Sequence, residues 1–190
     1  MTVEWPPRPP RPVVPSPAAG ATDLRGRRVI VGLPGLGWRG DLRADDRVVR
    51  GSRTYVPVIA EHEWYRAEAE QVEVFAPLVP AERVWVESLG ESGTTAPRGT
   101  DVLSRLVSLD LPPRRDPVPV VEADAVCGRR VVQLVEGVER RDLRAVTEVH
   151  TSDDGDICIR VATELDWYRW AWGGQAPRTL EVPVHLVWLE

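Results

Sequence analysis

The hydrophobic pattern predicts β-strands at matching places in the two halves of the chain. Residues 27–33 alternate loosely between polar and apolar side chains, and residues 130–135 are rich in valine, which favours strands. Residues 48–58 and 148–161 each contain two apolar runs around a turn, and Gly155 follows an aspartate in the second turn. Both of these segments are therefore predicted to be β-hairpins.

A short helical pattern follows each hairpin. Residues 60–71 have high helix propensity and carry acidic residues in the first turn, where they complement the helix dipole. In the other half, Thr163 is a good N-cap with Asp166 three positions later, and Gly173-Gly174 is a usual helix end. We expect one short helix in each half, followed by a last strand.

The two halves are divergent copies of one ancestral module. Four sequence blocks recur in the same order at offsets of 101 to 103 residues. Residues 64–87 and 167–190 align without a gap and share 8 of 24 positions, including two tryptophans at the same spacing. The blocks are Gly26-Arg27-Arg28-Val29 with Gly128-Arg129-Arg130-Val131, Asp41-Leu42-Arg43-Ala44 with Asp142-Leu143-Arg144-Ala145, Trp64-Tyr65-Arg66 with Trp167-Tyr168-Arg169, and Val84-Trp85-Val86-Glu87 with Val187-Trp188-Leu189-Glu190.

This order predicts a mainly β protein, a β-rich α+β fold of two tandem duplicated modules. The first module is expected over residues 23–88 and the second over 120–190. A small, strongly bent sheet or open barrel of the SH3-like kind, with one short helix, suits each module. An α+β sheet with the helix packed on one face is the alternative.

The segments outside the copies are expected to lack packed structure. Residues 1–22 are rich in proline and arginine, which favours polyproline II or disorder, so their deletion should leave the melting temperature unchanged. Within them, residues 6–11 fit a PxxPxR arrangement of the kind that docks on aromatic grooves. Residues 89–119 are expected to be a linker, with a short helix possible over 101–107.

Composition and charge narrow the classes of partner. All 24 basic residues are arginine, which a GC-rich coding sequence explains, and the net charge of −5 is spread over both signs. We therefore expect no binding of duplex nucleic acid, because no region carries a basic footprint. No stretch reaches 18 consecutive apolar residues, and the first residues lack the apolar run of a signal peptide. We expect a cytoplasmic protein with no membrane association.

No catalytic, cofactor or metal motif emerges from the sequence. The three histidines have no metal-ligand spacing, and the glycine-rich residues 32–37 match no phosphate-binding loop. Asp153, Asp154 and Asp156 surround a turn glycine and lack the distal glutamate of a calcium loop. Two cysteines without a CxxC spacing are interpreted as free thiols; they are Cys127 and Cys158. We expect no catalytic residues, no metal and no cofactor.

The repeated charges are interpreted as parts of each module's own structure. Asp41 and Arg43 recur as Asp142 and Arg144. We expect a retained ion pair with the Arg that follows Trp-Tyr, which is Arg66 in the first copy, or else half-exposed strand positions.

Aromatic residues carry the functional indication. Matched tryptophans such as Trp64 and Trp85 are expected in the module cores, because large rings bury much area. The unmatched ones differ: Trp170 and Trp172 replace alanines of the first copy. They pack between the copies, fill a gap or meet a partner. The candidate binding residues are Trp170, Trp172, Tyr168 and Trp38.

The sequence favours a non-enzymatic protein-interaction or scaffold protein with a protein partner. One alternative is an enzyme or ligand-binding protein with a site between the copies, using Asp142, Arg144 or His185. Another is an aromatic-cage reader of a cationic ligand, built on Trp170, Trp172 and Tyr168 with Glu164 and Asp166 nearby.

Overall fold

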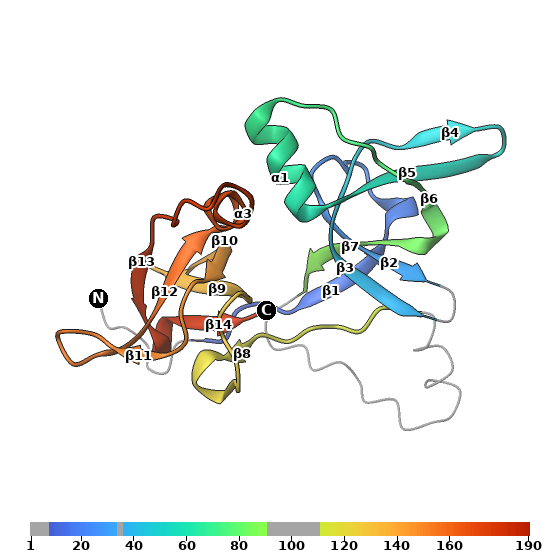
Figure 1. Cartoon of the computed structure of the whole chain (residues 1–190). Coiled ribbons are helices and arrows are strands. Elements are labelled where there is room, and N and C mark those ends of the chain that lie inside the picture. Colours follow the sequence, from blue (N-terminus) through green and yellow to red (C-terminus); the bar gives the residue numbers. More distant parts are fainter. Residues whose placement is uncertain (1–7, 34–35, 91–110) are drawn as a thin grey trace, which may run out of the picture. The chain divides into compact units, whose positions relative to one another are not determined.

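Two curled antiparallel sheets, each a half-barrel with one helix, make up the part of the chain that a computed structural model describes, which is residues 8–33, 36–90 and 111–190 (Figure 1). The described residues divide into two compact units, one formed by residues between 13 and 114 and the other by residues 115–190, and residues 8–12 are grouped with the second. We call these units the first and the second copy. The predicted fold class, mainly β with two duplicated modules, is confirmed.

The first copy forms a sheet in the order β1-β7-β2-β3-β5-β4, with β6 also paired to β5. Helix α1 contacts β3 and β5 and lies beside them in Figure 1. The elements are β1 (Val13–Pro17), η1 (Ala18–Gly20), β2 (Arg28–Leu33), β3 (Gly37–Ala44), β4 (Val48–Arg50), β5 (Arg53–Ala60), α1 (Glu61–Glu70), β6 (Leu78–Pro80), η2 (Ala81–Arg83) and β7 (Val84–Leu89).

The second copy repeats this series element by element, in the sheet order β11-β12-β10-β9-β14-β8 with β13 paired to β12. Helix α3 contacts β10 and β12, as α1 contacts β3 and β5. The elements are β8 (Val118–Pro119), η3 (Val120–Glu122), β9 (Arg130–Val135), β10 (Val138–Ala145), β11 (His150–Thr151), β12 (Ile157–Thr163), α3 (Glu164–Gly173), β13 (Leu180–Pro183), η4 (Val184–Leu186) and β14 (Val187–Leu189).

The predicted hairpins and helix signals are confirmed. Strand β4 pairs with β5 and β11 with β12, and the turn glycines Gly51 and Gly155 have φ of 62° and 88°. The Thr163 hydroxyl accepts a hydrogen bond from the backbone N–H of Asp166 at 3.1 Å, and Gly174 ends α3 in a left-handed conformation. Local sequence therefore specifies where these elements begin and end.

An aliphatic core lies inside each sheet, and most of its positions correspond between the copies. Twelve buried or half-buried positions of the first copy have aliphatic counterparts in the second at the offsets of the duplication, whereas Val31 corresponds to Gln133. The pairs are Ala18/Val120, Ala21/Ala123, Leu24/Val126, Val29/Val131, Leu42/Leu143, Ala44/Ala145, Val56/Ile159, Val58/Val161, Val79/Val182, Ala81/Val184, Val84/Val187 and Val86/Leu189. The side chains are small, which suits the interior of a tightly curled sheet.

The repeated Asp-Leu-Arg-Ala blocks mark a β-bulge in each copy. Leu42 to Ala44 end β3, and the same block ends β10. The strand pairing slips by one residue immediately before Leu42 and before Leu143, and Asp41 has a φ of 54°. A bulge bends and twists the strand, which helps a small sheet to curl.

Part of the proline-rich segment is folded, so the expectation of disorder over residues 1–22 is wrong for residues 13–20. Strand β1 pairs along its whole length with β7, and Pro17 lies opposite Trp85. In the second copy Pro119 lies opposite Trp188 in the same way. Proline lacks an N–H, but an edge strand accepts it because one side of its backbone needs no partner.

Prolines also precede each 3-10 turn of the two modules. Residues Pro17, Pro80, Pro119 and Pro183 have φ between −53° and −58° and ψ between 130° and 136°, and each leads directly into η1, η2, η3 or η4. Because the pyrrolidine ring presets φ near −65°, these turns lose little conformational entropy on folding.

Residues 8–12 lie with the second copy. The backbone N–H of Arg11 donates to Glu139 at 2.7 Å, and its guanidinium donates to the same carboxylate at 3.2 Å. The module boundaries therefore differ from those predicted: the first copy begins at Val13, and the second begins at Arg115. The proposed helix over residues 101–107 lies outside the described residues.

We expect removal of residues 1–17 to lower the melting temperature of the protein by several degrees, because the edge strand β1 and its pairing with β7 are lost. Removal of residues 1–7 alone, which leaves β1 in place, is the control. Thermal unfolding followed by circular dichroism measures both. Equal melting temperatures for the two truncations would contradict the packing of β1.

Candidate functional site

A buried ionic network joins the sheet of the first copy to its helix. The Glu61 carboxylate is fully buried and accepts hydrogen bonds from Arg43 at 2.8 Å and from Arg28 at 3.3 Å. Arg43 also donates to the carbonyl of Gly26 at 2.8 Å and to the hydroxyl of Tyr65 at 2.8 Å. The network fixes the start of α1 against strands β2 and β3.

The second copy contains the same network at the equivalent positions. Glu164 is 1% exposed and lies 3.6 Å from Arg130. Arg144 donates to the carbonyl of Gly128 at 2.9 Å and to the hydroxyl of Tyr168 at 2.7 Å. The interpretation of Arg43 and Arg144 as residues that serve the module's own structure fits this arrangement.

Opposed like charges explain why the glutamate is needed. Arg28 lies directly opposite Arg43 in the strand pairing, and Arg130 lies opposite Arg144. Such like-charged pairs destabilise a sheet, and the carboxylate from the helix neutralises part of that repulsion. In each copy this glutamate is also the first residue of the helix, where a negative charge favours the dipole.

Sequence reasoning missed this network. Of its two alternatives for the repeated charges, an ion pair with Arg66 is wrong for Arg43, since Arg66 pairs with Glu70 one turn along α1. A half-exposed strand position fits Arg43, which is half-buried on β3. The signal was present: Glu61 recurs as Glu164 at the same offset as the Trp-Tyr-Arg block. Helix spacing also indicated the contact, because Glu61 and Tyr65 are four residues apart and therefore lie on the same face of the helix.

The matched tryptophans lie around the aliphatic core clusters and not within them. The prediction that they form the module cores is therefore wrong in part. Trp188 is 6% exposed, whereas Trp64, Trp85 and Trp167 are only partly buried. Trp64 lies against Gly26: a Cβ at that glycine would meet the indole at 3.4 Å. Trp167 covers the equivalent glycine of the second copy in the same way.

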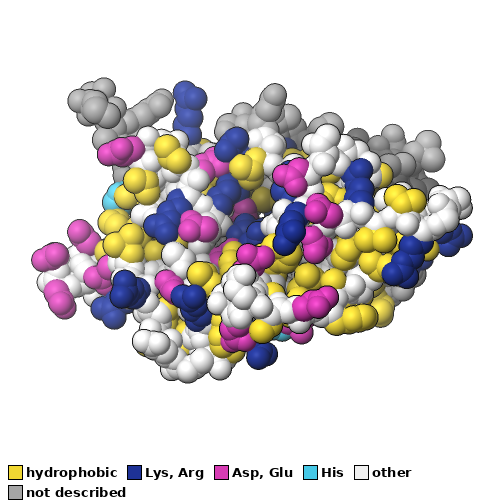
Figure 2. Space-filling view, turned by 90° about the horizontal axis from the view of Figure 1, so that it is seen from above, with side chains coloured by type: hydrophobic (Ala, Val, Ile, Leu, Met, Phe, Trp, Pro, Cys, Tyr) yellow, Lys and Arg dark blue, Asp and Glu magenta, His cyan; other side chains and the backbone are white. Residues whose placement is uncertain are grey.

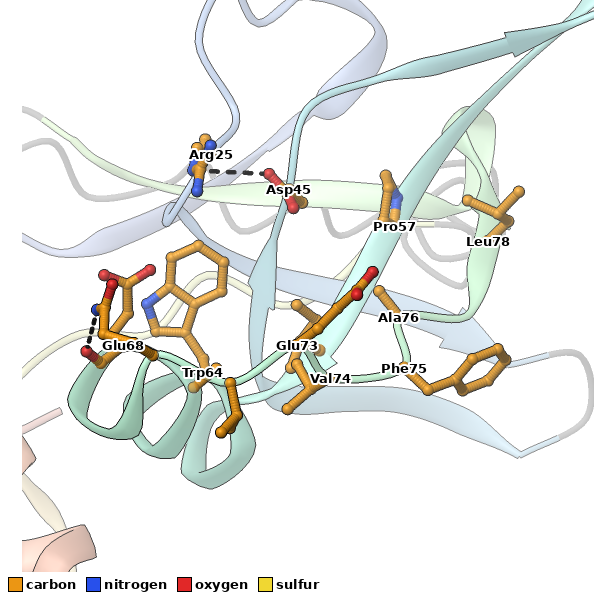
Figure 3. Close-up of a pocket in the computed structure, with 14 residues that line it drawn as sticks. Arg25, Asp45, Pro57, Trp64, Glu68, Glu73, Val74, Phe75, Ala76 and Leu78 are labelled. Carbon is orange, nitrogen blue, oxygen red and sulfur yellow. Dashed lines mark hydrogen bonds and ion pairs between the residues drawn. The ribbon is translucent and has the colours of Figure 1, made fainter.

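A pocket of about 720 Å³ opens beside Trp64 in the first copy (Figure 3). We call it the Trp64 pocket. Figure 3 shows the Trp64 indole rising from α1 toward Arg25 and Asp45. Its walls come from the loop before β2, from β5, from the last turns of α1 and from the segment that leads to β6. The lining residues are Arg25, Asp45, Pro57, Ile59, Trp64, Ala67, Glu68, Gln71, Val72, Glu73, Val74, Phe75, Ala76 and Leu78.

The end of α1 shapes this pocket. Gln71 adopts a left-handed conformation with φ of 54° and closes the helix, and its side-chain amide donates to the carbonyl of Glu68 at 2.7 Å. The chain then runs extended along the pocket before Pro77, whose carbonyl accepts the N–H of Val58 at 3.0 Å. These contacts hold the far wall of the pocket in place.

A second, smaller cavity of about 380 Å³ lies on the other side of the same segment, and Val74 and Phe75 line both cavities. We call it the Val79 groove. Its lining is mainly apolar and includes Leu33 and Val79. Phe75 is 84% exposed, an unusual state for so large an apolar side chain.

The second copy differs at the residues that form the Trp64 pocket. Trp170 stands where the first copy has Ala67, and its indole packs edge-on against Trp167 with ring centroids 5.4 Å apart. At the positions of Glu68 and Glu73 the second copy has alanine. The two copies thus share the network and the core and diverge at this place.

The predicted binding residues have these positions in the structure. Trp170 is 36% exposed and Trp172 is partly buried, both on α3. Tyr168 is held by Arg144, whose guanidinium carbon lies 5.0 Å from the ring centroid. Trp38 belongs to the other copy, so these four side chains do not form one constellation within a copy.

Trp38 has a local structural explanation. It lies opposite Gly32 in the strand pairing and forms an edge-on pair with Trp85, with centroids 4.9 Å apart. A Cβ at Gly32 would come within 2.8 Å of the Trp38 ring. In the second copy the corresponding pair is Leu134 and Glu139, so glycine and tryptophan changed together.

The remaining polar candidates do not converge. His62, His150 and His185 lie in three different elements, and Cys127 and Cys158 are free, as expected. Among the residues that the structure describes, no three His, Cys, Asp or Glu side chains are placed to hold a metal ion.

Three groups of the second copy have shifted pKa values. Burial acts to raise the pKa of Glu139, but the hydrogen bond from the Arg11 backbone and the charge of Arg141 outweigh it and lower that pKa. The hydrogen bond to Glu181 at 2.6 Å, helped by the Glu148 carbonyl, raises the pKa of His150. Burial raises the pKa of the Cys158 thiol, which makes it a poor nucleophile.

On the face shown in Figure 2, acidic and basic side chains are interspersed among hydrophobic ones, and neither sign of charge forms a continuous tract. Within the described parts of the chain, no helix is both long and apolar enough to cross a membrane.

Comparison of the chain with protein-family models, with curated proteins and with solved structures gives no match.

We expect Glu61→Gln to lower the free energy of unfolding by about 3 kcal/mol, because it leaves two half-buried arginines without their buried carboxylate. Glu164→Gln should have a similar effect in the second copy. Glu63→Gln, at an exposed site in the same helical turn, should cost less than about 1 kcal/mol. Urea unfolding measures all three, and equal effects for Glu61 and Glu63 would refute the role of the network.

We expect Glu181→Gln to lower the pKa of His150, measured by NMR titration of its imidazole proton. Since the folded-state pKa is raised above the ordinary value of 6.5, the contact stabilises the fold fully below that pH. The contribution is lost as the pH rises through the folded-state pKa. Asp154→Asn in the neighbouring turn is the control, and an unchanged pKa in Glu181→Gln would contradict the assignment.

Proposed function

We propose that this protein is a non-enzymatic interaction protein whose first copy docks a partner protein over Phe75 and the two cavities beside it. The observation that carries the proposal is the exposure of Phe75, at 84%, on the segment between the Trp64 pocket and the Val79 groove. Large exposed apolar side chains that border pockets are typical of protein-binding surfaces.

Neighbouring side chains extend this apolar surface. Val72, 45% exposed, lines the Trp64 pocket, and Leu33, 37% exposed, lines the Val79 groove. A chain laid across the segment would place one side chain in each cavity with Phe75 between them. Burial of the three apolar residues would supply several kcal/mol of binding energy, at about 25 cal/mol per Å².

Divergence between the copies supports a division of roles. The second copy has Arg178 at the position of Phe75, so the docking surface belongs to the first copy. The second copy keeps the core and the ionic network, which suits a scaffold. A likeness of each half-barrel to SH3-like modules stays a prediction.

The two other hypotheses from the sequence also stay predictions: a site between the copies, and an aromatic cage around Trp170, Trp172 and Tyr168. For the cage, the Tyr168 ring already has the Arg144 guanidinium beside it. A ligand cation would compete with it, so this contact favours the interaction protein over the cage reader.

A photo-cross-linking amino acid placed at Phe75 should capture the partner in cells of the source organism, because a docked chain would lie within reach of that side chain. Val49, which is apolar and 69% exposed on β4 but lines neither cavity, is the matched control position. Mass spectrometry should find a protein linked at position 75 and not at 49. The same products at both positions, or none at either, would refute the docking surface.

A further inference from the structure

The Trp64 pocket combines an aromatic wall with an excess of negative charge. Three carboxylates line it against one guanidinium: Asp45, Glu68 and Glu73 against Arg25. Arg25 lies 3.8 Å from Asp45, so this guanidinium is already partnered. Glu68 and Glu73 provide the negative charge that remains.

The helix adds to this negative potential. Ala67, Glu68 and Gln71 bring the last turn of α1 and its cap into the pocket wall. The carbonyl end of a helix carries a partial negative charge of about half an electron, and no basic side chain lies in the last turn of α1 to offset it. A positive group placed in the pocket would meet both the carboxylates and this dipole.

We propose that the Trp64 pocket binds an arginine side chain of the partner, an inference that rests on the proposed function. A guanidinium stacks on an indole face and pairs with carboxylates in the same plane, whereas the compact, strongly hydrated lysine ammonium does this less well. The shared wall of Val74 and Phe75 leads from this pocket to the Val79 groove. The partner segment is therefore an arginine followed closely by an apolar side chain.

The second copy serves as an internal comparison. At the positions of Glu68, Glu73 and Phe75 it has Ala171, Ala176 and Arg178, and the bulky Trp170 stands beside Trp167. The second copy thus lacks the two glutamates and the exposed phenylalanine. It also has an additional indole beside its matched tryptophan. The cation site is a property of the first copy that the second does not share.

The test is an NMR titration of the full ¹⁵N-labelled chain with a pentapeptide that has a central arginine flanked by leucines. A peptide with citrulline in place of arginine keeps the shape and removes the charge. We expect the arginine peptide to bind about tenfold more tightly, with amide shifts at residues 67–76. Binding should weaken as sodium chloride is raised, because the pocket is open to solvent.

A double variant, Glu68→Gln with Glu73→Gln, should weaken binding of the arginine peptide about tenfold and leave the citrulline peptide unaffected. Both side chains are exposed, so the variant is expected to fold. Glu70→Gln removes one charge from the same helical turn without touching the pocket and is the matched control.

Equal affinity for the arginine and citrulline peptides would overturn the cation site, and a cross-link at Phe75 would then still support the docking surface. The cation site would also be overturned if the arginine peptide shifted only protein amides outside residues 67–76. If the wild type self-associates and the double variant does not, the bound arginine belongs to another molecule of this protein. That result would overturn the proposal of a separate partner.

Discussion

Each module depends on one buried carboxylate that lies between two arginines facing each other on adjacent strands. Without Glu61, the cross-strand pair Arg28 and Arg43 would bring two positive charges together under the helix. With it, a helix of only ten residues is tied to the sheet at its first residue. A helix this short is marginal by itself in water, so its anchoring to the sheet is what makes it persist.

The curl of the sheet comes from a second set of local constraints. A bulge before Leu42 or Leu143 bends one strand, and prolines preset the 3-10 turns that precede the last strands. The core then needs only small aliphatic side chains. This explains why the tryptophans within the described residues all lie outside the aliphatic core clusters, even Trp188, which is 6% exposed.

After the duplication the two copies kept a common frame and diverged elsewhere. The network and the aliphatic core are shared because losing either would cost each module much of its stability. The positions around Trp64 and Trp167 lie outside the network and the core clusters. The first copy has an open acidic pocket there, and the second copy has a pair of packed indoles. Our proposals place the function where the shared structural constraints end.

The sequence by itself determined what depends on near neighbours along the chain. The hairpin turns, the capping of α3 by Thr163 and the duplication follow from residue types at short or fixed spacing, and all could be predicted. The partners of Arg43 could not, because its contacts with Glu61, Tyr65 and Gly26 join positions 17 to 22 residues apart. Strand β1 could not be predicted either, because a proline-rich sequence is typical of a disordered tail. Only its pairing with β7, which is distant in the sequence, makes it a strand.

Only the tertiary structure decided which side of each large ring stays open. Trp64 and Trp167 are the same residue in the same block, yet one borders a pocket and the other packs against Trp170. Sequence periodicity assigns a side chain to a face of a helix or strand. The contact of Trp167 with Trp170 is local, but the open space beside Trp64 also depends on Arg25, Asp45 and Pro57. Distant segments bring these residues to the helix, so packing settles the shape of the pocket only once the module has folded.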